Sequence, residues 1–327
     1  MIRRLLYLFL IGLMIDNLIT KEDLIAFLKG ISPKSIYRCR FGEVVSESPV
    51  EIDFDSNDFQ EEAREIIRRY VNQGFALFDS RSCEINVDII KTLESILCLG
   101  EPYIPCRYKG SNIINLYSKG VNIISSHLNG KMINQPNTVI QTKLHAFTTA
   151  SEQNLHVDGT LEAIGSIKTS ILLCVNPAIS GGESIIFNSV AAFVELAEQD
   201  MEAAISLLDC MCLKRENLDC GDFAFGPAFL LRNNDLFTRY SIDVTSSWNY
   251  DFKDCSHFKR ACEYLKEKTK SGSSFLFEKR LLSGQGIIIA NDKVSHGRKI
   301  YVDSSGQTRT FLRSIYYSQP HFDNGSW

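Results

Sequence analysis

The stretch Asn154-Leu155-His156-Val157-Asp158 carries an imidazole and a carboxylate two residues apart. In an extended strand, residues i and i+2 point to the same face, so His156 and Asp158 would present both groups side by side. Two histidines and one carboxylate on one face of a metal, with the other face open, are typical of non-haem Fe(II) centres that activate oxygen. The pair therefore predicts two thirds of a metal site, and a second histidine must come from elsewhere.

The pair alone is weak evidence for a metal site. With 39 acidic residues and six histidines in 327, an acid two places after a histidine is expected by chance. His321-Phe322-Asp323 is a second such pair, and nothing follows it that could complete a site. Taken alone, either pair could simply lie in a strand or turn, with its polar side chains hydrogen-bonded. The residues downstream of His156 must decide between the two interpretations.

Charge and cysteine content restrict the partners and the compartment. The formal net charge is -4, and no dense Lys/Arg run is interleaved with aromatic residues, so we expect a small-molecule substrate and no nucleic acid. Ten cysteines are scattered without a C-x-x-C motif, which argues against a structural zinc site or a disulfide scaffold. We therefore expect a cytoplasmic protein with reduced cysteines.

The N-terminus allows more than one interpretation. Arg3-Arg4 followed by the apolar residues 5–15 has the charge and length of a signal-peptide start. No small-x-small cleavage site is obvious before Asp16, however, and the run is too short to span a bilayer. We favour translation from Met14, or a packed N-terminal helix, over secretion, and we expect no membrane partner. The sequence does not decide between Met1 and Met14 as the start.

The pattern of apolar residues predicts the elements that must position the site. Helical spacing recurs over residues 16–30, 58–72, 86–99, 190–215 and 259–270. Short apolar or alternating runs predict strands over residues 75–78, 139–147, 166–175, 185–187, 287–290 and 308–317. Short strands with helices at the start and in an insert favour a mainly β fold with flanking helices, a β-barrel or jelly roll.

We expect one structural domain with two parts. Residues 1–100 would form an N-terminal helical region packed on the core. Residues 101–327 would form the jelly-roll core, with a helical insert around residues 190–270. No internal repeat or low-complexity tract interrupts this division.

Several motifs follow the His-x-Asp pair in a recognisable order: Gly181-Gly182-Glu183-Ser184, Gly286 with its apolar strand, His296-Gly297-Arg298, and then Arg309 and Arg313. As an ordered set, over roughly residues 60 to 318, they resemble the Fe(II)/2-oxoglutarate-dependent dioxygenases of the taurine dioxygenase and clavaminate synthase-like group. The resemblance implies a double-stranded β-helix, or jelly-roll, core. It also implies that His156, Asp158 and His296 bind Fe(II).

The resemblance assigns the co-substrate to residues near the C-terminus. It implies that Arg309, thirteen residues after His296, pairs with the far carboxylate of 2-oxoglutarate. A guanidinium suits this role because it meets a carboxylate through two parallel, charge-assisted hydrogen bonds. Ser184 stands where the family often has threonine and could donate to the same carboxylate. Arg313, on the same strand face as Arg309, would touch the co-substrate or an anionic group of the substrate.

The implied reaction couples decarboxylation of 2-oxoglutarate, with O2, to succinate and CO2, and to oxidation of a small substrate. Hydroxylation is the expected outcome, with desaturation or ring closure as alternatives. Asp158 argues against halogenation, because related halogenases replace this carboxylate. The resemblance suggests an amino-acid-derived metabolite and a place in secondary metabolism. Candidate substrate contacts are Gln141, which lies on a predicted strand, Asp243, which could also be a plain exposed loop acid, and Arg313.

Two other classes of protein remain possible on the sequence alone. The first is a β-barrel that binds a metal without oxidising anything. The second is a non-catalytic binding module in which His156 and His296 never converge.

Overall fold

The computed structural model describes residues 19–44, 48–54, 59–81, 84–105, 117–118, 120–125, 149–218, 220–251, 256–304 and 306–322. The predicted strand over residues 139–147, the substrate candidate Gln141 and the N-terminal residues 1–18 lie outside this part of the chain.

The N-terminal helices form where the helical spacing predicts them. Helix α2 (Lys21–Gly30) begins at a capping box in which Thr20 and Asp23 satisfy each other's backbone amides. Helix α4 (Gln60–Gln73) ends at Gly74, whose φ of 85° is a left-handed conformation that favours glycine. Helix α5 (Val87–Ile96) begins after Asn86, whose side chain accepts from a backbone amide of the first turn. Shorter turns are η2 (Ile36–Arg38) and α3 (Phe41–Val44).

The largest sheet has seven strands in the order β1-β2-β15-β6-β18-β4-β3. They are β1 (Val50–Glu51), β2 (Phe75–Asp79), β15 (Gln285–Ala290), β6 (Thr169–Asn176), β18 (Thr310–Tyr316), β4 (Val121–Ser125) and β3 (Tyr117–Ser118). The pair β1–β2 is parallel and the other pairs are antiparallel. The N-terminal hundred residues are therefore not only a helical layer, because β1 and β2 complete one side of this sheet.

A second sheet has the strand order β14-β8-β16-β5. Its strands are β14 (Leu276–Lys279), β8 (Ser184–Phe187), β16 (Ser295–Arg298) and β5 (Gln153–His156). Side chains of both sheets share one apolar core, which includes Leu77 and Phe311 of the large sheet and Leu155 and Ile186 of the small one. The two sheets therefore pack on each other, as the sheets of a jelly roll do.

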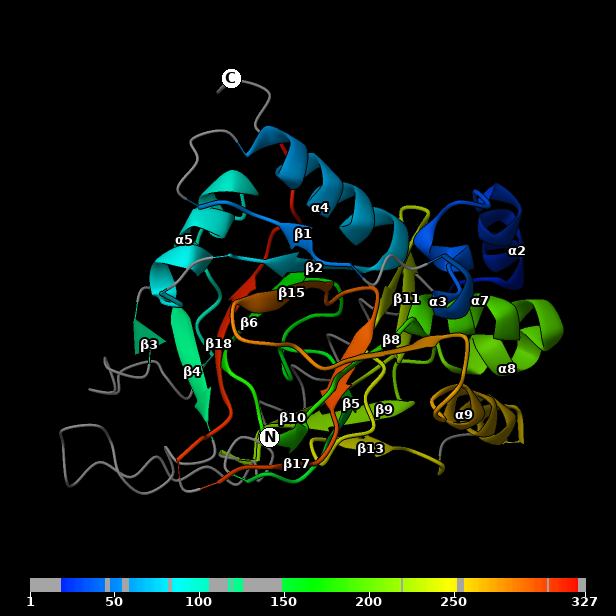
Figure 1. The fold of residues 1–327 in the computed structure, drawn as a ribbon. Helices are drawn as coiled ribbons and strands as arrows, with labels where there is room; N and C mark the ends of the chain where they lie inside the picture. The colour runs from blue at the N-terminus through cyan, green and yellow to red at the C-terminus, as the bar shows by residue number, and fades with distance from the viewer. Residues whose placement is uncertain are drawn as a thin grey trace.

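The opposite face of the large sheet is covered by helices. Alternate residues of its strands, such as Phe78 and Ile288, form a second core with residues of α4 and α5. Figure 1 shows α4 lying over β1 and β2, with α5 beside it above β4. The expectation of a mainly β fold with flanking helices is thus confirmed.

The insert between β8 and β14 contains strands as well as helices. Its helices are α7 (Ser189–Gln199), α8 (Met201–Ser206) and α9 (Ser256–Lys268). Its strands are β9 (Leu213–Glu216), β10 (Phe223–Gly226), β11 (Phe229–Arg232), β12 (Asp235–Thr238) and β13 (Ser246–Trp248). The prediction of a helix over residues 190–215 was therefore wrong for its last residues, which belong to β9. Residues 213–216 alternate between buried and half-buried positions, which is the period of a strand.

Two short strands, β7 (Ser180–Gly181) and β17 (Tyr301–Val302), pair antiparallel next to β8 and β16 in the chain. Within the described residues, no helix has both the length and the apolar character needed to cross a membrane.

Candidate active site

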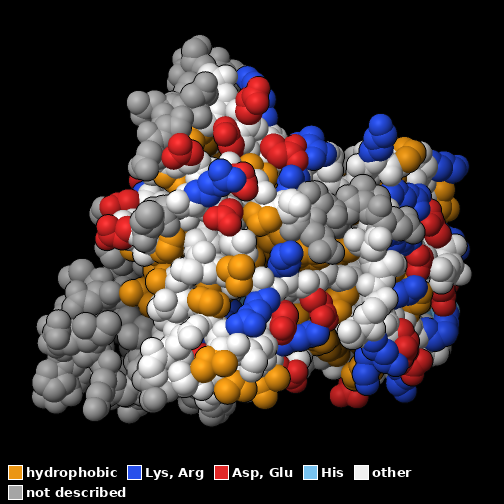
Figure 2. Space-filling view, in the orientation of Figure 1, with side chains coloured by type: hydrophobic (Ala, Val, Ile, Leu, Met, Phe, Trp, Pro, Cys, Tyr) orange, Lys and Arg blue, Asp and Glu red, His pale blue; other side chains and the backbone are white. Residues whose placement is uncertain are grey.

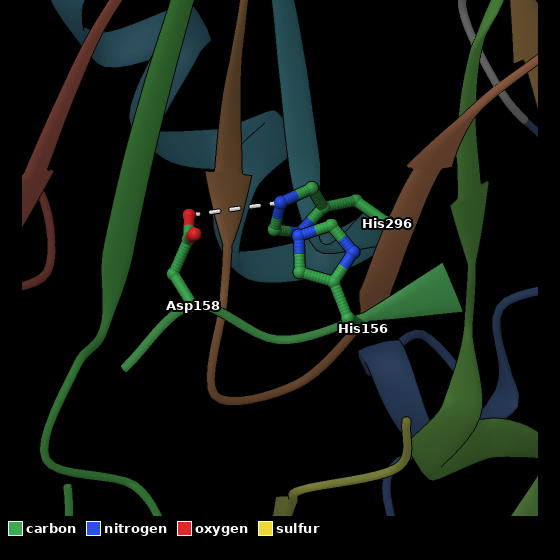
Figure 3. Close-up of side chains that lie close together, drawn as sticks. All are labelled: His156, Asp158 and His296. Atoms are coloured by element: carbon green, nitrogen blue, oxygen red, sulfur yellow. Dashed lines mark ion pairs between the residues drawn. The ribbon is translucent and has the colours of Figure 1, made fainter. Parts of the chain in front are cut away.

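The small sheet brings the two predicted histidine ligands together. His156 at the end of β5 lies directly opposite His296 in β16, and their ring centroids are 4.4 Å apart. Asp158 follows β5 and turns its carboxylate towards them, with 3.6 Å between Oδ2 and His296 Nε2. Figure 3 shows the three side chains pointing at one another. One possible ligand atom from each lies within 4.8 Å of the others, which is close enough to share a metal ion.

The large sheet holds the carboxylate ligand in place. Arg313 of β18 forms an ion pair with Asp158 Oδ1 at 3.0 Å, and the Ser170 hydroxyl of β6 donates to Oδ2 at 2.7 Å. The Asn291 side chain accepts from the Asp158 backbone amide at 2.7 Å. Burial alone would raise the pKa of the Asp158 carboxyl, but Arg313 and the two imidazoles outweigh burial and keep this pKa well below its usual range.

Hydrogen bonding orients one histidine for a metal, and burial keeps the other neutral. His156 Nδ1 lies 3.0 Å from the Asn154 carbonyl oxygen, which can only accept, so Nδ1 donates there and Nε2 is the nitrogen left for a metal. Burial, and then the neighbouring His156, lower the pKa of His296 to about 3. Two imidazoles beside an ionised carboxylate are the donor set that suits a divalent metal such as Fe(II). The residues present therefore fit the metal that the sequence motifs imply.

A small cavity of about 40 Å³ adjoins the triad on the side of the predicted co-substrate residues. His156, His296, Ser184 and Arg309 all line it. The Arg309 side chain is 6% exposed and lies over the Phe311 ring, 3.9 Å from its centroid. Within the described residues no carboxylate forms an ion pair with Arg309, so a buried cation faces this cavity. Burial, and then the nearby Arg298, lower the pKa of Arg309 to about 10.

The Gly181-Gly182 motif does more than turn the chain. Both residues have positive φ, 69° and 75°. A Cβ atom on Gly182 would lie 3.2 Å from Arg309 Nε, which is a tight contact. A Cβ atom on Gly181 would lie 2.3 Å from the Ile300 carbonyl oxygen, which excludes a side chain there. The glycine pair therefore lets the turn pass directly against the Arg309 guanidinium.

A larger cavity of about 210 Å³ also borders the triad. His156, Asp158 and Arg313 lie in its lining, together with Asp243 and Arg215 of the insert. Apolar side chains contribute as well: Tyr103, Leu161, Val244 and Ile315. Its size and position suit a small substrate, and the candidate Asp243 lies on its wall, half-buried. The candidate Gln141 lies outside the described residues.

Two further arginines near the triad, Arg313 and Arg298, bond to other groups of the protein. Arg313 lines both cavities, but its guanidinium bonds the Asp158 carboxylate and the Asn122 side chain, at 3.0 and 3.2 Å. Arg298 donates to the backbone carbonyls of Thr149 and Ser151.

Sequence reasoning missed Ser170 and Arg215. Neither residue belongs to a motif, and their contacts with the triad region arise only when distant strands meet.

Two packed sheets that bring two histidines and a carboxylate together beside two cavities define a non-haem iron oxygenase of the jelly-roll class. Residues 41–316 match the family described as Taurine catabolism dioxygenase TauD, TfdA family. The chain belongs to this family, and it is an Fe(II)- and 2-oxoglutarate-dependent dioxygenase.

Known proteins similar to this chain agree with that assignment. A "Uridine-5'-phosphate dioxygenase" from Amycolatopsis sp is 35% identical over 277 residues, which are 84% of this chain and 94% of the relative. The solved structure of AAD-2 with Mn(II) and N-oxalylglycine is 15% identical, with a TM-score of 0.59 over 83% of this chain and 94% of that one. The iron oxygenase OrfP with Fe, succinate and (3S)-hydroxy-L-Arg is 13% identical, with a TM-score of 0.54 over 80% of this chain and 81% of that one. At these identities the two structures share the fold, and they confirm the jelly roll.

Proposed function

We propose that His156, Asp158 and His296 hold the Fe(II) of this dioxygenase, and that Arg309 with Ser184 binds the far carboxylate of 2-oxoglutarate. The convergence of the three ligand side chains within 4.8 Å carries the metal assignment. The buried Arg309 in the cavity beside them supports the co-substrate assignment. Guanidinium and carboxylate would meet there through paired hydrogen bonds in a site of low dielectric constant.

Each side chain has a distinct part in the reaction. Iron held by His156, Asp158 and His296, together with 2-oxoglutarate and O2, would supply the oxidising chemistry, with succinate and CO2 as co-products. The chain's own residues fix the geometry: Arg313 and Ser170 orient the Asp158 carboxylate, and the Asn154 carbonyl fixes the His156 tautomer. Burial of His296 and Asp158 keeps bulk water away from the reacting groups.

For the substrate, we propose a pyrimidine nucleoside 5'-monophosphate. The observation that carries this choice is the 35% identity to a uridine-5'-phosphate dioxygenase along 94% of that relative. The 210 Å³ cavity supports it, because its lining offers the apolar side chains of Tyr103 and Ile315 for a planar base beside the polar metal site.

An amino acid is the second candidate substrate. Asp243 favours it, because this carboxylate lines the large cavity and could pair with an ammonium group. The fold relative OrfP binds a hydroxylated arginine, although it shares only 13% identity with this chain. For either substrate the stoichiometry is the same: one O2 and one 2-oxoglutarate yield succinate, CO2 and a hydroxylated product.

An anaerobic titration tests the metal and co-substrate assignments. Adding Fe(II) and 2-oxoglutarate to the purified protein should produce the visible charge-transfer band of an iron-chelated keto acid. His156→Ala and Asp158→Ala should abolish this band. His321→Ala is the matched control, because His321 stands in the second His-x-Asp pair and is exposed. A band that survives in His156→Ala, or disappears in His321→Ala, would contradict the proposed site.

A second experiment separates the two substrate classes. Succinate release would be followed with uridine 5'-monophosphate, with uridine, and with a panel of amino acids. Turnover that needs the phosphate supports the nucleotide, whereas turnover with an amino acid alone supports the second candidate. Succinate release that no tested compound stimulates would reject both classes while leaving the metal assignment intact.

A further inference from the structure

The residue between two of the proposed metal ligands is hydrogen-bonded to the insert through both its backbone N–H and its carbonyl. Val157 stands between His156 and Asp158. Its backbone N–H donates to the Ser241 hydroxyl at 3.3 Å, and its carbonyl accepts from Arg215 Nη2 at 3.4 Å. One residue before His156, the Leu155 carbonyl accepts from the Ile242 amide at 2.8 Å. The turn that sets the spacing of the two ligands is therefore held by residues outside the jelly-roll sheets.

Arg215 is the cation at the centre of this attachment. It lies in β9, is 1% exposed, and donates to the Ser241 and Thr245 hydroxyls as well as to Val157. Its Nε has no hydrogen-bond partner among the described residues. Burial lowers the pKa of Arg215, and the nearby Asp243 offsets part of that effect. A guanidinium buried among neutral partners is costly, so its presence here points to a specific task.

Thr245 orients Arg215 and connects it to the large cavity. The Thr245 hydroxyl accepts from Arg215 at 3.1 Å and donates to Asp243 Oδ1 at 2.7 Å. The Thr245 carbonyl also accepts from the Glu216 amide, next to Arg215 in β9. A continuous path of hydrogen bonds thus runs from Asp243, on the cavity wall, through Arg215 to the Val157 peptide.

We propose that Arg215 is a positioning residue for the metal site. From the insert, and oriented by Thr245, it fixes the Val157 peptide and thereby the separation of the His156 and Asp158 side chains. Groups that orient metal ligands typically change metal affinity about 10- to 100-fold when they are removed. The inference rests on the proposed metal site.

Arg239 supplies a matched control. It is also a buried arginine of the insert, 7% exposed, and it also donates to backbone carbonyls of the segment after β5. Its partners are Thr160 and Glu162, which lie beyond the ligands, at 3.4 and 2.7 Å. Loss of either arginine removes a buried cation, but only Arg215 bonds the peptide between the ligands.

Calorimetric titration with Mn(II) on the metal-free protein tests the inference without any substrate. Arg215→Gln should bind Mn(II) about 10- to 100-fold more weakly than the wild type, whereas Arg239→Gln should stay within about threefold. The Mn(II) affinity of Thr245→Val should lie between those of the two arginine variants. Thr245→Ser keeps the hydroxyl and should bind Mn(II) as tightly as the wild type. Equal losses in both arginine variants, or no loss in Arg215→Gln, would overturn the inference.

Two outcomes keep this test separate from the metal proposal. If the wild-type protein itself does not bind Mn(II), the proposed metal site fails. If Arg215→Gln does not fold, as judged by circular dichroism, Arg215→Lys replaces it. A lysine can reach one of the three partners of Arg215 but not all of them, so its affinity should still fall.

Discussion

Three arginines beside the metal triad differ in what they contact. Arg313 bonds the proposed metal ligand Asp158, and Arg215 bonds the backbone between two proposed ligands. Arg309 instead faces a cavity and stacks on aromatic rings, 3.9 Å from the Phe311 centroid and 5.2 Å from the Tyr301 centroid. Of these three cations, Arg309 is thus the one placed to bind a carboxylate from solution.

Arg309→Lys should weaken co-substrate binding without removing the charge. An ammonium group is a point charge and cannot make the paired hydrogen bonds of a guanidinium, so we expect KM for 2-oxoglutarate to rise about tenfold. Mn(II) affinity should stay near the wild-type value. The measurement is succinate release against 2-oxoglutarate concentration, with Arg280→Lys as the control. Arg280 donates to the Ala178 and Ile179 carbonyls and lines neither cavity. An unchanged KM would remove Arg309 from the co-substrate site.

Among the individual residues, the sequence predicted those that belong to motifs with a characteristic spacing. His156 and Asp158 are two residues apart, although β5 ends at His156 and Asp158 lies just beyond it, and His296 and Arg309 follow at a recognisable distance, so their types and order were readable. Ser170 and Arg215 were not readable, because a serine on a buried strand and a strand arginine have many ordinary roles. Their contacts with Asp158 and Val157 depend on how separate elements meet in three dimensions.

Among the elements, the turn between β7 and β8 has the tightest steric requirement at the site. Gly181 and Gly182 form it with positive φ, and the turn runs beside β17 and Arg309. The turn therefore links the pairing of β7 with β17 to the position of Arg309, the proposed co-substrate residue.

Gly182→Ala should cost both stability and co-substrate affinity. A non-glycine residue with φ of 75° costs roughly 1–2 kcal/mol, and its Cβ would press on Arg309 at 3.2 Å. Gly272→Ala is the matched control, since Gly272 has φ of 84° but an added Cβ there would have no neighbour within 4 Å. Chemical unfolding should show similar losses for both variants. Only Gly182→Ala should raise KM for 2-oxoglutarate, and a rise in both would show that strain alone is responsible.

The elements themselves were predicted unevenly. Helices α4 and α5 and strands β15 and β18 appear where their periodicity placed them, because one apolar face decides their structure. The insert was expected to be helical, but its described residues form five strands in addition to α7, α8 and α9. Strands such as β9 are only four residues long, so their alternation is too short to separate from the end of a helix.

Across the whole molecule, burial rather than surface charge stabilises the arrangement of the parts. Figure 2 shows Lys and Arg interspersed with Asp and Glu over the side that carries α2, α8 and α9. Lys21–Glu202 joins α2 to α8 at 2.8 Å, and Arg260–Asp200 joins α9 to the start of α8 at 2.7 Å. Exposed pairs of this kind contribute little each, so the shared apolar core must hold the insert on the sheets.

A buried carboxyl makes the stability of the whole protein depend on pH. Burial raises the pKa of Asp292 to about 6, so its contribution to stability is present at low pH and is lost as pH rises through 6. Asp292→Asn stays neutral and should be more stable than the wild type at pH 8, by up to about 3 kcal/mol. The difference should shrink towards zero near pH 4.

Urea unfolding of the metal-free protein at several pH values measures this difference. Asp251→Asn is the control, because Asp251 is exposed and its replacement should change stability by less than about 0.5 kcal/mol at any pH. An Asp292→Asn variant that is less stable than the wild type at pH 8 would show that the carboxylate has a stabilising partner.

The contacts of Asp158 have one more consequence. Arg313, Ser170 and Asn291 fix its side chain and backbone through the protein's own atoms. Asp158 therefore loses little conformational entropy when a cation binds. We expect the protein to fold without the metal, in contrast to proteins that fold only around their metal. A chelator should strip the ion and leave an intact, reloadable scaffold.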